Sequence, residues 1–196
     1  MPIPNEQREY TFEDYLNWPE DERWEIIDGI AYCQATPSPV HQNISMNLSR
    51  ILSNYFLDKE CKVFAAPFTV RLPMKEGQTD EKKNNRIVKP DLSVICDKGR
   101  LDKNGYSGAP TLIVEIVSRS SAKKDNIIKV SKYEQAGVKE YWIVTPETET
   151  IMSYVLDEHG EFPRPEMYVL GEDEEIVSKV FTDLTIKLEN IFETWI

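Results

Sequence analysis

The segment TLIVEIVS (residues 111–118) constrains the fold of this chain more than any other feature. It is short and almost continuously apolar, a pattern typical of a strand that is buried on both faces. Glu115 stands in the middle of this run, where burial of a carboxylate is costly unless the group is paired with a cation or binds a metal. The sequence therefore predicts a central strand that carries one acidic side chain with a specific partner.

A helix and a second apolar strand follow this segment. KKDNIIKVSKYEQAG (residues 123–137) predicts a helix that ends at Gly137, because glycine readily adopts the left-handed conformation after a helix. Tyr133 shares one side of that helix with other apolar residues and is expected in the core. EYWIVTP (residues 140–146) then predicts a second buried strand. A strand, a helix and a strand in this order favour a right-handed crossover within a mixed sheet.

The remaining segments predict an N-terminal helix and hairpin, further strands and a C-terminal meander. Asp28-Gly29 is a strong hairpin signal between two short apolar runs in residues 23–35. Apolar residues at helical spacing predict a helix over 41–57, and one strand is expected over 86–96. The predicted fold is α/β, with a mixed central β-sheet flanked by helices, in a single domain over residues 1–196. Its other expected strands are 61–73, bent at Pro67, and the meander of 151–157 and 166–170.

Composition limits the classes of protein to which the chain can belong. An apolar share of 40% suits a globular domain, and no apolar run is long enough to span a membrane. Cys33, Cys61 and Cys96 lie far apart, which indicates buried free thiols rather than a zinc site or a disulfide framework, and the cytoplasm is the expected location. The net charge of −11 argues mildly against DNA, although basic residues gather in 82–89 and 119–132.

Asp91 is a second candidate for acid chemistry. It follows Pro90 at the head of the apolar segment LSVI, and a loop joins that segment to residues 111–118. Neighbouring strands would bring Asp91 and Glu115 to one edge, where two carboxylates repel each other unless a cation such as Mg²⁺ lies between them. The alternative is that each acid pairs with its own Lys or Arg. The spacing alone leaves both interpretations open.

Three motifs in series carry a family resemblance. VKPDLSVI is a Pro-Asp strand, PTLIVEIVS an E-x-x-S strand, and DNIIKVSKYEQAGVKEYWIV a D-x-x-x-K-x-x-x-Y helix with its following strand. With YTFEDYLNWPEDERWEIIDGIAY, SPVHQNI and TDLTIKLENIF, the chain resembles the Uma-type family of restriction-endonuclease-like proteins in the PD-(D/E)XK nuclease superfamily. The resemblance implies a restriction-endonuclease-like fold and an endonuclease that cleaves DNA with Mg²⁺, for which Mn²⁺ substitutes.

The resemblance also assigns catalytic residues. Asp91 matches the Asp of PD, and Glu115 matches the acidic residue of (D/E)XK. The superfamily's lysine would lie two residues after Glu115, where this chain has Val117. In the Uma-type arrangement the lysine comes from the following helix, which points to Lys129, with Asp125 as an auxiliary residue. The alternative for Lys129 is an i,i+4 pair with Asp125 on a solvated helix face.

A metal site follows from the same resemblance. Glu25 matches the glutamate of the family's early hairpin, with an outward-facing strand position as the alternative. His41 matches the SP-x-H position, where it would contact a phosphate or orient a carboxylate, and a structural role is the alternative. The expected metal ligands are Asp91, Glu115, Glu25 and the backbone carbonyl of Ile116.

Two functions from different classes remain open at this level. The first is metal-assisted hydrolysis of DNA phosphodiesters, in which Lys129 steadies the attacking water or the phosphate. The second is a catalytically degenerate nuclease fold that serves as a binding or assembly module, for example as a homodimer. The absent lysine at Val117 and the acidic net charge favour the second function. Hydrolysis of RNA is a third, weaker option.

Overall fold

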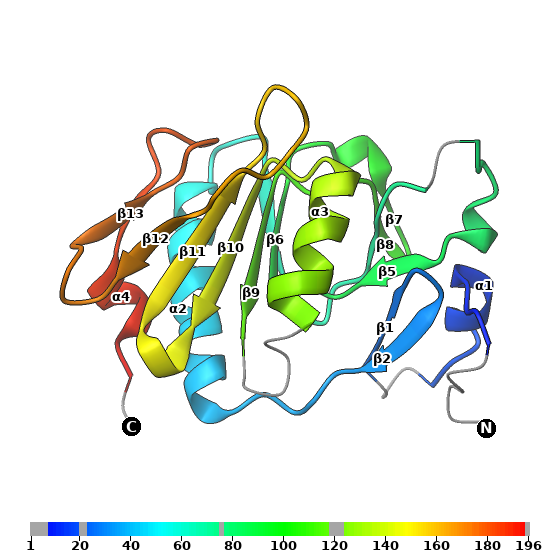
Figure 1. The fold of residues 1–196 in the computed structure, drawn as a ribbon, viewed down its shortest axis with the longest axis horizontal. Coiled ribbons are helices and arrows are strands. Elements are labelled where there is room, and N and C mark those ends of the chain that lie inside the picture. The colour runs from blue at the N-terminus through cyan, green and yellow to red at the C-terminus, as the bar shows by residue number, and fades with distance from the viewer. Residues whose placement is uncertain (1–7, 20–22, 75–76, 118–123, 195–196) are drawn as a thin grey trace.

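A computed structural model describes residues 8–19, 23–74, 77–117 and 124–194, without the side chains of 124–126. Within these ranges the strands form two six-stranded sheets and a two-stranded ribbon (Figure 1). We call the sheets the central sheet and the N-terminal sheet. The ribbon pairs β13 (Glu175–Val177) with β14 (Thr185–Lys187).

The central sheet contains the predicted crossover. β9 and β10 are parallel neighbours, and the other pairs in this sheet are antiparallel, so the sheet is mixed as predicted. Every residue of β9 is buried, as its apolar sequence indicates. In spatial order the strands are β12 (Glu166–Val169), β11 (Thr150–Val155), β10 (Glu140–Thr145), β9 (Leu112–Ile116), β6 (Leu92–Ile95) and β3 (Lys62–Ala65).

The N-terminal sheet begins with the predicted hairpin. Asp28 and Gly29 have φ values of 49° and 83°, the left-handed backbone that a tight hairpin turn requires and that glycine and aspartate tolerate. In spatial order the strands are β2 (Ile30–Cys33), β1 (Trp24–Ile27), β5 (Arg86–Val88), β4 (Val70–Arg71), β8 (Gly105–Ser107) and β7 (Leu101–Asp102).

The chain passes between the two sheets at two prolines. β3 and β4 belong to different sheets and are separated at Pro67, as the predicted bend indicates. The prediction of one strand over 86–96 is wrong, because β5 and β6 also belong to different sheets and are separated at Pro90. Proline has no N–H to donate and so interrupts a ladder of backbone hydrogen bonds. The backbone N of Ala66 donates to the carbonyl of Asp91 at 2.9 Å, so the two crossings lie side by side.

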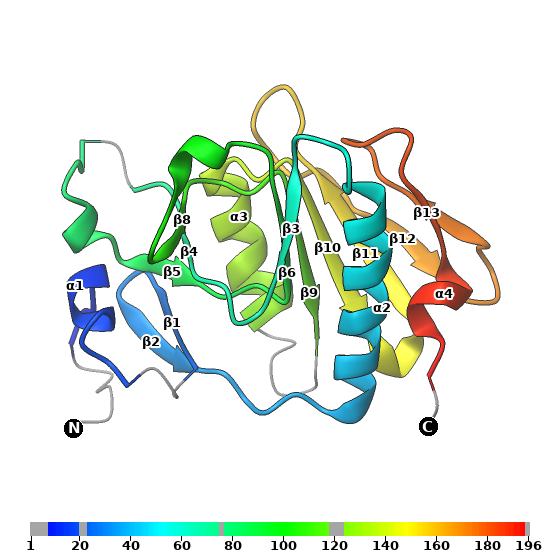
Figure 2. The same cartoon turned by 180° about the vertical axis from the view of Figure 1, so that it is seen from behind.

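Helices cover both faces of the central sheet. α2 (Pro39–Tyr55) packs on one face, and α3 (Val130–Ala136), which follows a π-helical turn η3 (Lys124–Lys129), packs on the other (Figures 1 and 2). Gly137 ends α3 with φ 82°, as predicted. No helix in the described ranges has the length and apolarity to cross a membrane. The other helices are α1 (Phe12–Tyr15), α4 (Leu188–Phe192) and the 3₁₀ turns η1 (Glu81–Lys83), η2 (Lys98–Arg100) and η4 (Pro146–Thr148).

A disulfide joins β3 to β6 at the edge of the central sheet. Cys61 and Cys96 flank the paired residues Lys62 and Ile95 of these antiparallel strands, and their sulfurs are bonded at 2.01 Å. The prediction of buried free thiols is therefore wrong for both, and Cys33, which is free, is exposed. The sequence carries no signal for this bond, because the two cysteines come opposite each other only through the register of β3 and β6.

Loss of this disulfide will lower stability. The bond closes a loop with a sequence separation of 35 residues. Loop-closure entropy in the unfolded chain then predicts that Cys96→Ser reduces the free energy of unfolding by about 3–4 kcal/mol. Urea unfolding under non-reducing conditions measures the change, and Cys33→Ser is the control without effect. Three reactive thiols in the unreduced, denatured wild-type protein would contradict the assignment.

Candidate active site

Asp91 and Glu115 lie at one end of the β6–β9 pair. Leu92 and Val114 are paired across these strands, and the two acids each come one residue beyond that pair. The backbone N of Ile116 donates a hydrogen bond of 2.8 Å to Oδ2 of Asp91. The Asp91 carboxylate therefore lies against the peptide group that follows Glu115. This end is also the carboxyl end of β9.

Glu115 turns its side chain toward α3. Its Oε1 lies 2.7 Å from Nζ of Lys129 and accepts a hydrogen bond of 2.7 Å from the hydroxyl of Tyr133. Glu115 is only 4% exposed, so both contacts form away from bulk water. A carboxylate buried to this degree needs such partners, as its apolar neighbours in β9 indicate.

Lys129 connects two acids from different sheets. Its Nζ lies 2.9 Å from Oε1 of Glu25 in β1 as well as 2.7 Å from Glu115 in β9. Lys129 is 1% exposed and Glu25 is fully buried, so neither occupies the solvated position that was the alternative for each. Asp125 has its backbone in η3, and its side chain lies outside the described part of the chain. The N-terminal sheet and the central sheet thus meet at one ammonium group from the end of η3.

Tyr133 is in the core, as predicted, but its hydroxyl has a polar role that the prediction missed. Burial raises the pKa of Tyr133 well above its ordinary value, and the charge of Glu115 raises it further. The phenol therefore keeps its proton at neutral pH and donates a hydrogen bond to Glu115. Tyr133 lies four residues after Lys129, and this spacing places both side chains on one helix face.

His41 holds Asp91 from the first turn of α2. Its Nε2 lies 3.0 Å from Oδ1 of Asp91. The side chain of Ser38 caps the helix by accepting a hydrogen bond of 3.2 Å from the backbone N of His41. The side chain that holds Asp91 thus comes from α2, whereas those that hold Glu115, Lys129 of η3 and Tyr133 of α3, come from the opposite face. The two acids share one end of β9 but are held by partners from different layers.

A second ion cluster fixes the hairpin against α3. Asp28 in the β1–β2 turn lies 2.9 Å from Nε of Arg86 in β5 and 2.6 Å from Nζ of Lys132 in α3. Burial raises the pKa of Asp28, but hydrogen bonds and charges from Lys132 and Arg86 outweigh that effect and lower the pKa below its usual value. Because β1 also carries Glu25, this cluster helps to set the distance between Glu25 and Lys129.

The donors at this end of β9 suit a hard divalent cation. The carboxylates of Asp91 and Glu115 and the carbonyl of Ile116 carry oxygen donors, the kind of atom that Mg²⁺ prefers, and Mg²⁺ commonly uses one or two carboxylates and keeps several waters. Among the described residues, no three His, Cys, Asp or Glu side chains are grouped to hold a metal ion. Glu25, expected as a third carboxylate, contacts the same Lys129 ammonium as Glu115.

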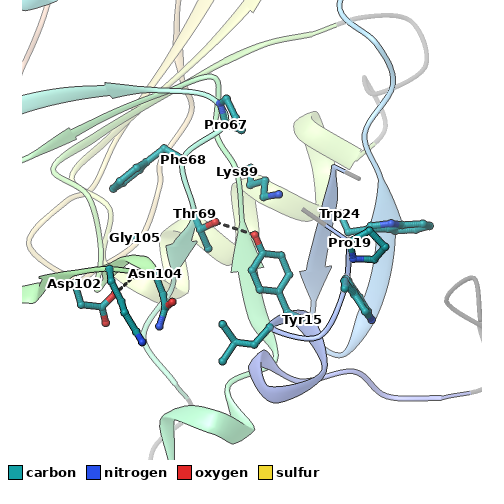
Figure 3. A pocket seen from close by; sticks show the side chains of 13 residues that line it. Tyr15, Pro19, Trp24, Pro67, Phe68, Thr69, Lys89, Asp102, Asn104 and Gly105 are labelled. Atoms are coloured by element: carbon teal, nitrogen blue, oxygen red, sulfur yellow. Dashed lines mark hydrogen bonds between the residues drawn. The ribbon is translucent and has the colours of Figure 1, made fainter. Parts of the chain in front are cut away.

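A cavity of about 460 Å³ lies beside the candidate site and was not predicted. Figure 3 shows Tyr15, Trp24, Phe68 and Lys89 around it. Lys89 and Asp91 stand on either side of Pro90, so the cavity reaches the segment where the chain passes between the sheets. The aromatic residues of the lining are scattered over the first 70 positions, and no local sequence pattern indicates that they line one cavity.

Removal of the central cation will strongly destabilise the fold. Lys129→Met leaves two buried carboxylates without their cation and should lower the free energy of unfolding by about 3–5 kcal/mol. Tyr133→Phe removes one hydrogen bond to a charged group and should cost about 1.5–3 kcal/mol. Urea denaturation measures both changes. Lys139→Met is the matched control, because Lys139 is exposed. A Lys129→Met protein as stable as that control would show that the buried ion cluster does not form.

Comparisons with known proteins bear on the fold and the family of this chain. A crystal structure from Anabaena variabilis, described as a "putative nuclease belonging to DUF820", superposes with a TM-score of 0.73 at 17% identity, over 93% of this chain and 97% of the other. That likeness shows the restriction-endonuclease-like α/β fold predicted from the sequence. An uncharacterized protein of Synechocystis sp. is 26% identical over 153 residues, which are 76% of each chain. The model of the Uma2 family, described as "Putative restriction endonuclease", matches residues 12–189, and the chain therefore belongs to the Uma2 family.

Proposed function

We propose that this protein is a metal-dependent phosphodiester hydrolase that acts on DNA, an endonuclease. One observation carries the proposal: the buried ammonium of Lys129 lies 2.7 Å from Glu115 at the same end of β9 as Asp91. The superfamily pattern has a lysine at the position of Val117. In this chain Lys129, which comes from the following helical segment, would take the place of that lysine. The names of the family and of the structural neighbour, which refer to nucleases, support this assignment.

Each residue of the site has a proposed role. Asp91, Glu115 and the carbonyl of Ile116 would hold the cation, Mg²⁺ or Mn²⁺. A divalent cation supplies positive charge that stabilises the developing charge on the phosphate and makes a water more acidic. Lys129 is a compact point charge that would steady the attacking water or a phosphate oxygen.

Three further residues position these groups. Tyr133 donates to Glu115 and fixes its orientation, and Glu25 holds Lys129 from the opposite side. His41 contacts Asp91 and keeps its carboxylate against the Ile116 amide. Side chains that are locked by such contacts lose little freedom when substrate arrives, which is the main benefit of a preorganised site.

A catalytically degenerate binding module is the second candidate. Lys129 is engaged by two buried carboxylates, and so its ammonium must leave or share these contacts to reach a phosphate. The net charge of −11 also weakens attraction to DNA. A module of this kind would bind a partner or a second copy of the chain and would cleave nothing.

Isosteric removal of either acid will separate the two candidates. Asp91→Asn and Glu115→Gln should each reduce Mg²⁺-dependent DNA cleavage by more than about 100-fold, because even residues that only support metal ligands contribute 10- to 100-fold. Gel assays on plasmid, linear duplex and single-stranded DNA measure the rate, and EDTA should abolish it. Asp183→Asn is the control, since that carboxylate is 73% exposed and contacts Lys59.

Thermal shift completes the test. Binding of Mg²⁺ or Mn²⁺ to the folded state raises the melting temperature by mass action, and this shift should disappear in Asp91→Asn and Glu115→Gln. A wild-type protein that is inert on every DNA form with both metals contradicts the hydrolase and favours the binding module.

A further inference from the structure

The cavity beside the candidate site has an aromatic wall. Tyr15 and Trp18 reach it from α1 and the segment that follows, Trp24 from β1, and Phe68 from the crossing between β3 and β4 (Figure 3). The rings of Trp18 and Trp24 lie 5.8 Å apart, edge to face, and those of Tyr15 and Trp18 lie 6.0 Å apart. Flat apolar rings grouped around a hollow are suited to contact another flat ring.

Lys89 places a buried positive charge in the same wall. Its side chain lies among the aromatic residues in Figure 3, the residue is only 8% exposed, and its Nζ is 5.3 Å from the centroid of the Tyr15 ring. Within the part of the chain that the structure describes, no carboxylate lies within 4.0 Å of that ammonium. A cation so far removed from water normally has an anionic partner.

The other buried cations in the described ranges show the difference. Lys129 contacts Glu25 and Glu115. Arg71 contacts Asp102 at 2.6 Å, and Arg86 contacts Asp28 at 2.9 Å. Asp102 also lines the cavity, but Arg71 compensates its charge. The described residues that line the cavity therefore leave the charge of Lys89 available for an anion that enters from outside.

The cavity and the candidate active site share their backbone. The backbone N of Lys89 donates a hydrogen bond of 3.0 Å to Oε1 of Glu25, the residue that follows Trp24. Two residues of extended chain span at most about 7 Å, so Lys89 lies close to Asp91. A ligand with a repeating charge can therefore contact Lys89 with one group while the next group faces the two acids at the end of β9.

We propose that the cavity binds an unpaired base and its flanking phosphate in a single strand of DNA whose neighbouring phosphodiester faces Asp91 and Glu115. Lys89 contacts the phosphate, and the base stacks on the aromatic wall. Stacking of this kind tolerates any sequence because every base has a flat face. A base pair within a duplex keeps its faces covered, so the cavity selects single strands or unpaired ends. The placement of the neighbouring phosphodiester at Asp91 and Glu115 rests on the proposed function. Binding of the DNA strand in the cavity requires no cleavage.

Binding in EDTA tests this proposal without catalysis. Anisotropy of a labelled oligothymidylate gives the dissociation constant, and quenching of tryptophan fluorescence reports stacking. The single strand should bind at least about tenfold more tightly than a blunt duplex of equal length, because only unpaired bases can stack. Lys89→Met should weaken single-strand binding severalfold and should reduce the slope of log K against log salt by about 0.7, the value for one lost phosphate contact.

Two control variants and one stability measurement accompany this test. Lys139→Met changes the net charge equally at an exposed position and should leave the affinity and the slope unchanged. Trp18→Leu should weaken binding and leave the slope unchanged, because it removes stacking but no charge. Lys89→Met should melt at the same temperature as wild type or higher, since it removes a buried cation.

Several outcomes would overturn the proposal. Equal affinity of Lys89→Met and Lys139→Met for the oligothymidylate is one, duplex binding as tight as single-strand binding is another, and absence of tryptophan quenching is a third. A protein that binds single strands through Lys89 but cleaves no DNA overturns the proposed function alone. A protein that cleaves DNA and whose Lys89→Met variant retains full affinity overturns the cavity assignment alone.

Discussion

The contact of Lys129 with Glu25 and Glu115 is the interaction on which the rest of the arrangement depends. It joins β1 of one sheet, β9 of the other and the end of η3 at a point with almost no access to water. A buried ion cluster of this kind rarely stabilises a fold more than apolar residues of the same volume would. Glu140 shows the contrast, because it is also fully buried but accepts hydrogen bonds from Trp142, Ser153, Ser178 and backbone amides, with no cation beside it among the described residues. A cation placed between two acids fits the proposed role of Lys129 in the reaction.

The division of the chain between two sheets explains the position of the Pro-Asp dipeptide. Pro90 interrupts the backbone ladder where the chain leaves β5 and enters β6, and Asp91 follows at once. Asp91 therefore stands at the junction of the sheets, where its carbonyl accepts from Ala66 and its carboxylate contacts the Ile116 amide and His41. The same junction holds the cavity lined by Lys89, which comes directly before Pro90. The candidate active site and the proposed strand-binding cavity thus depend on one irregular segment.

Much of this arrangement was predictable from local patterns. The apolar run around Glu115, the helix ended by Gly137 and the Asp28-Gly29 turn each follow from short-range chemistry, and all three are confirmed. The resemblance pointed to Lys129, which the structure places beside Glu115. Features that depend on long-range register were not predictable: the division of residues 86–96 between two sheets, the bond between Cys61 and Cys96, and the hydroxyl contact of Tyr133. Sequence periodicity records which face is apolar, but it does not record which distant residue lies opposite.

The most direct test of the central claim is a crystal structure with Mn²⁺ soaked into the protein, read by anomalous scattering at the manganese edge. We expect one strong anomalous peak at the carboxyl end of β9, coordinated by oxygens of Asp91 and Glu115 and by the carbonyl of Ile116, with Lys129 beside it. Absence of a peak there at saturating Mn²⁺, or a peak bound only to surface acids remote from β9, would contradict the assignment of these two carboxylates as a metal site.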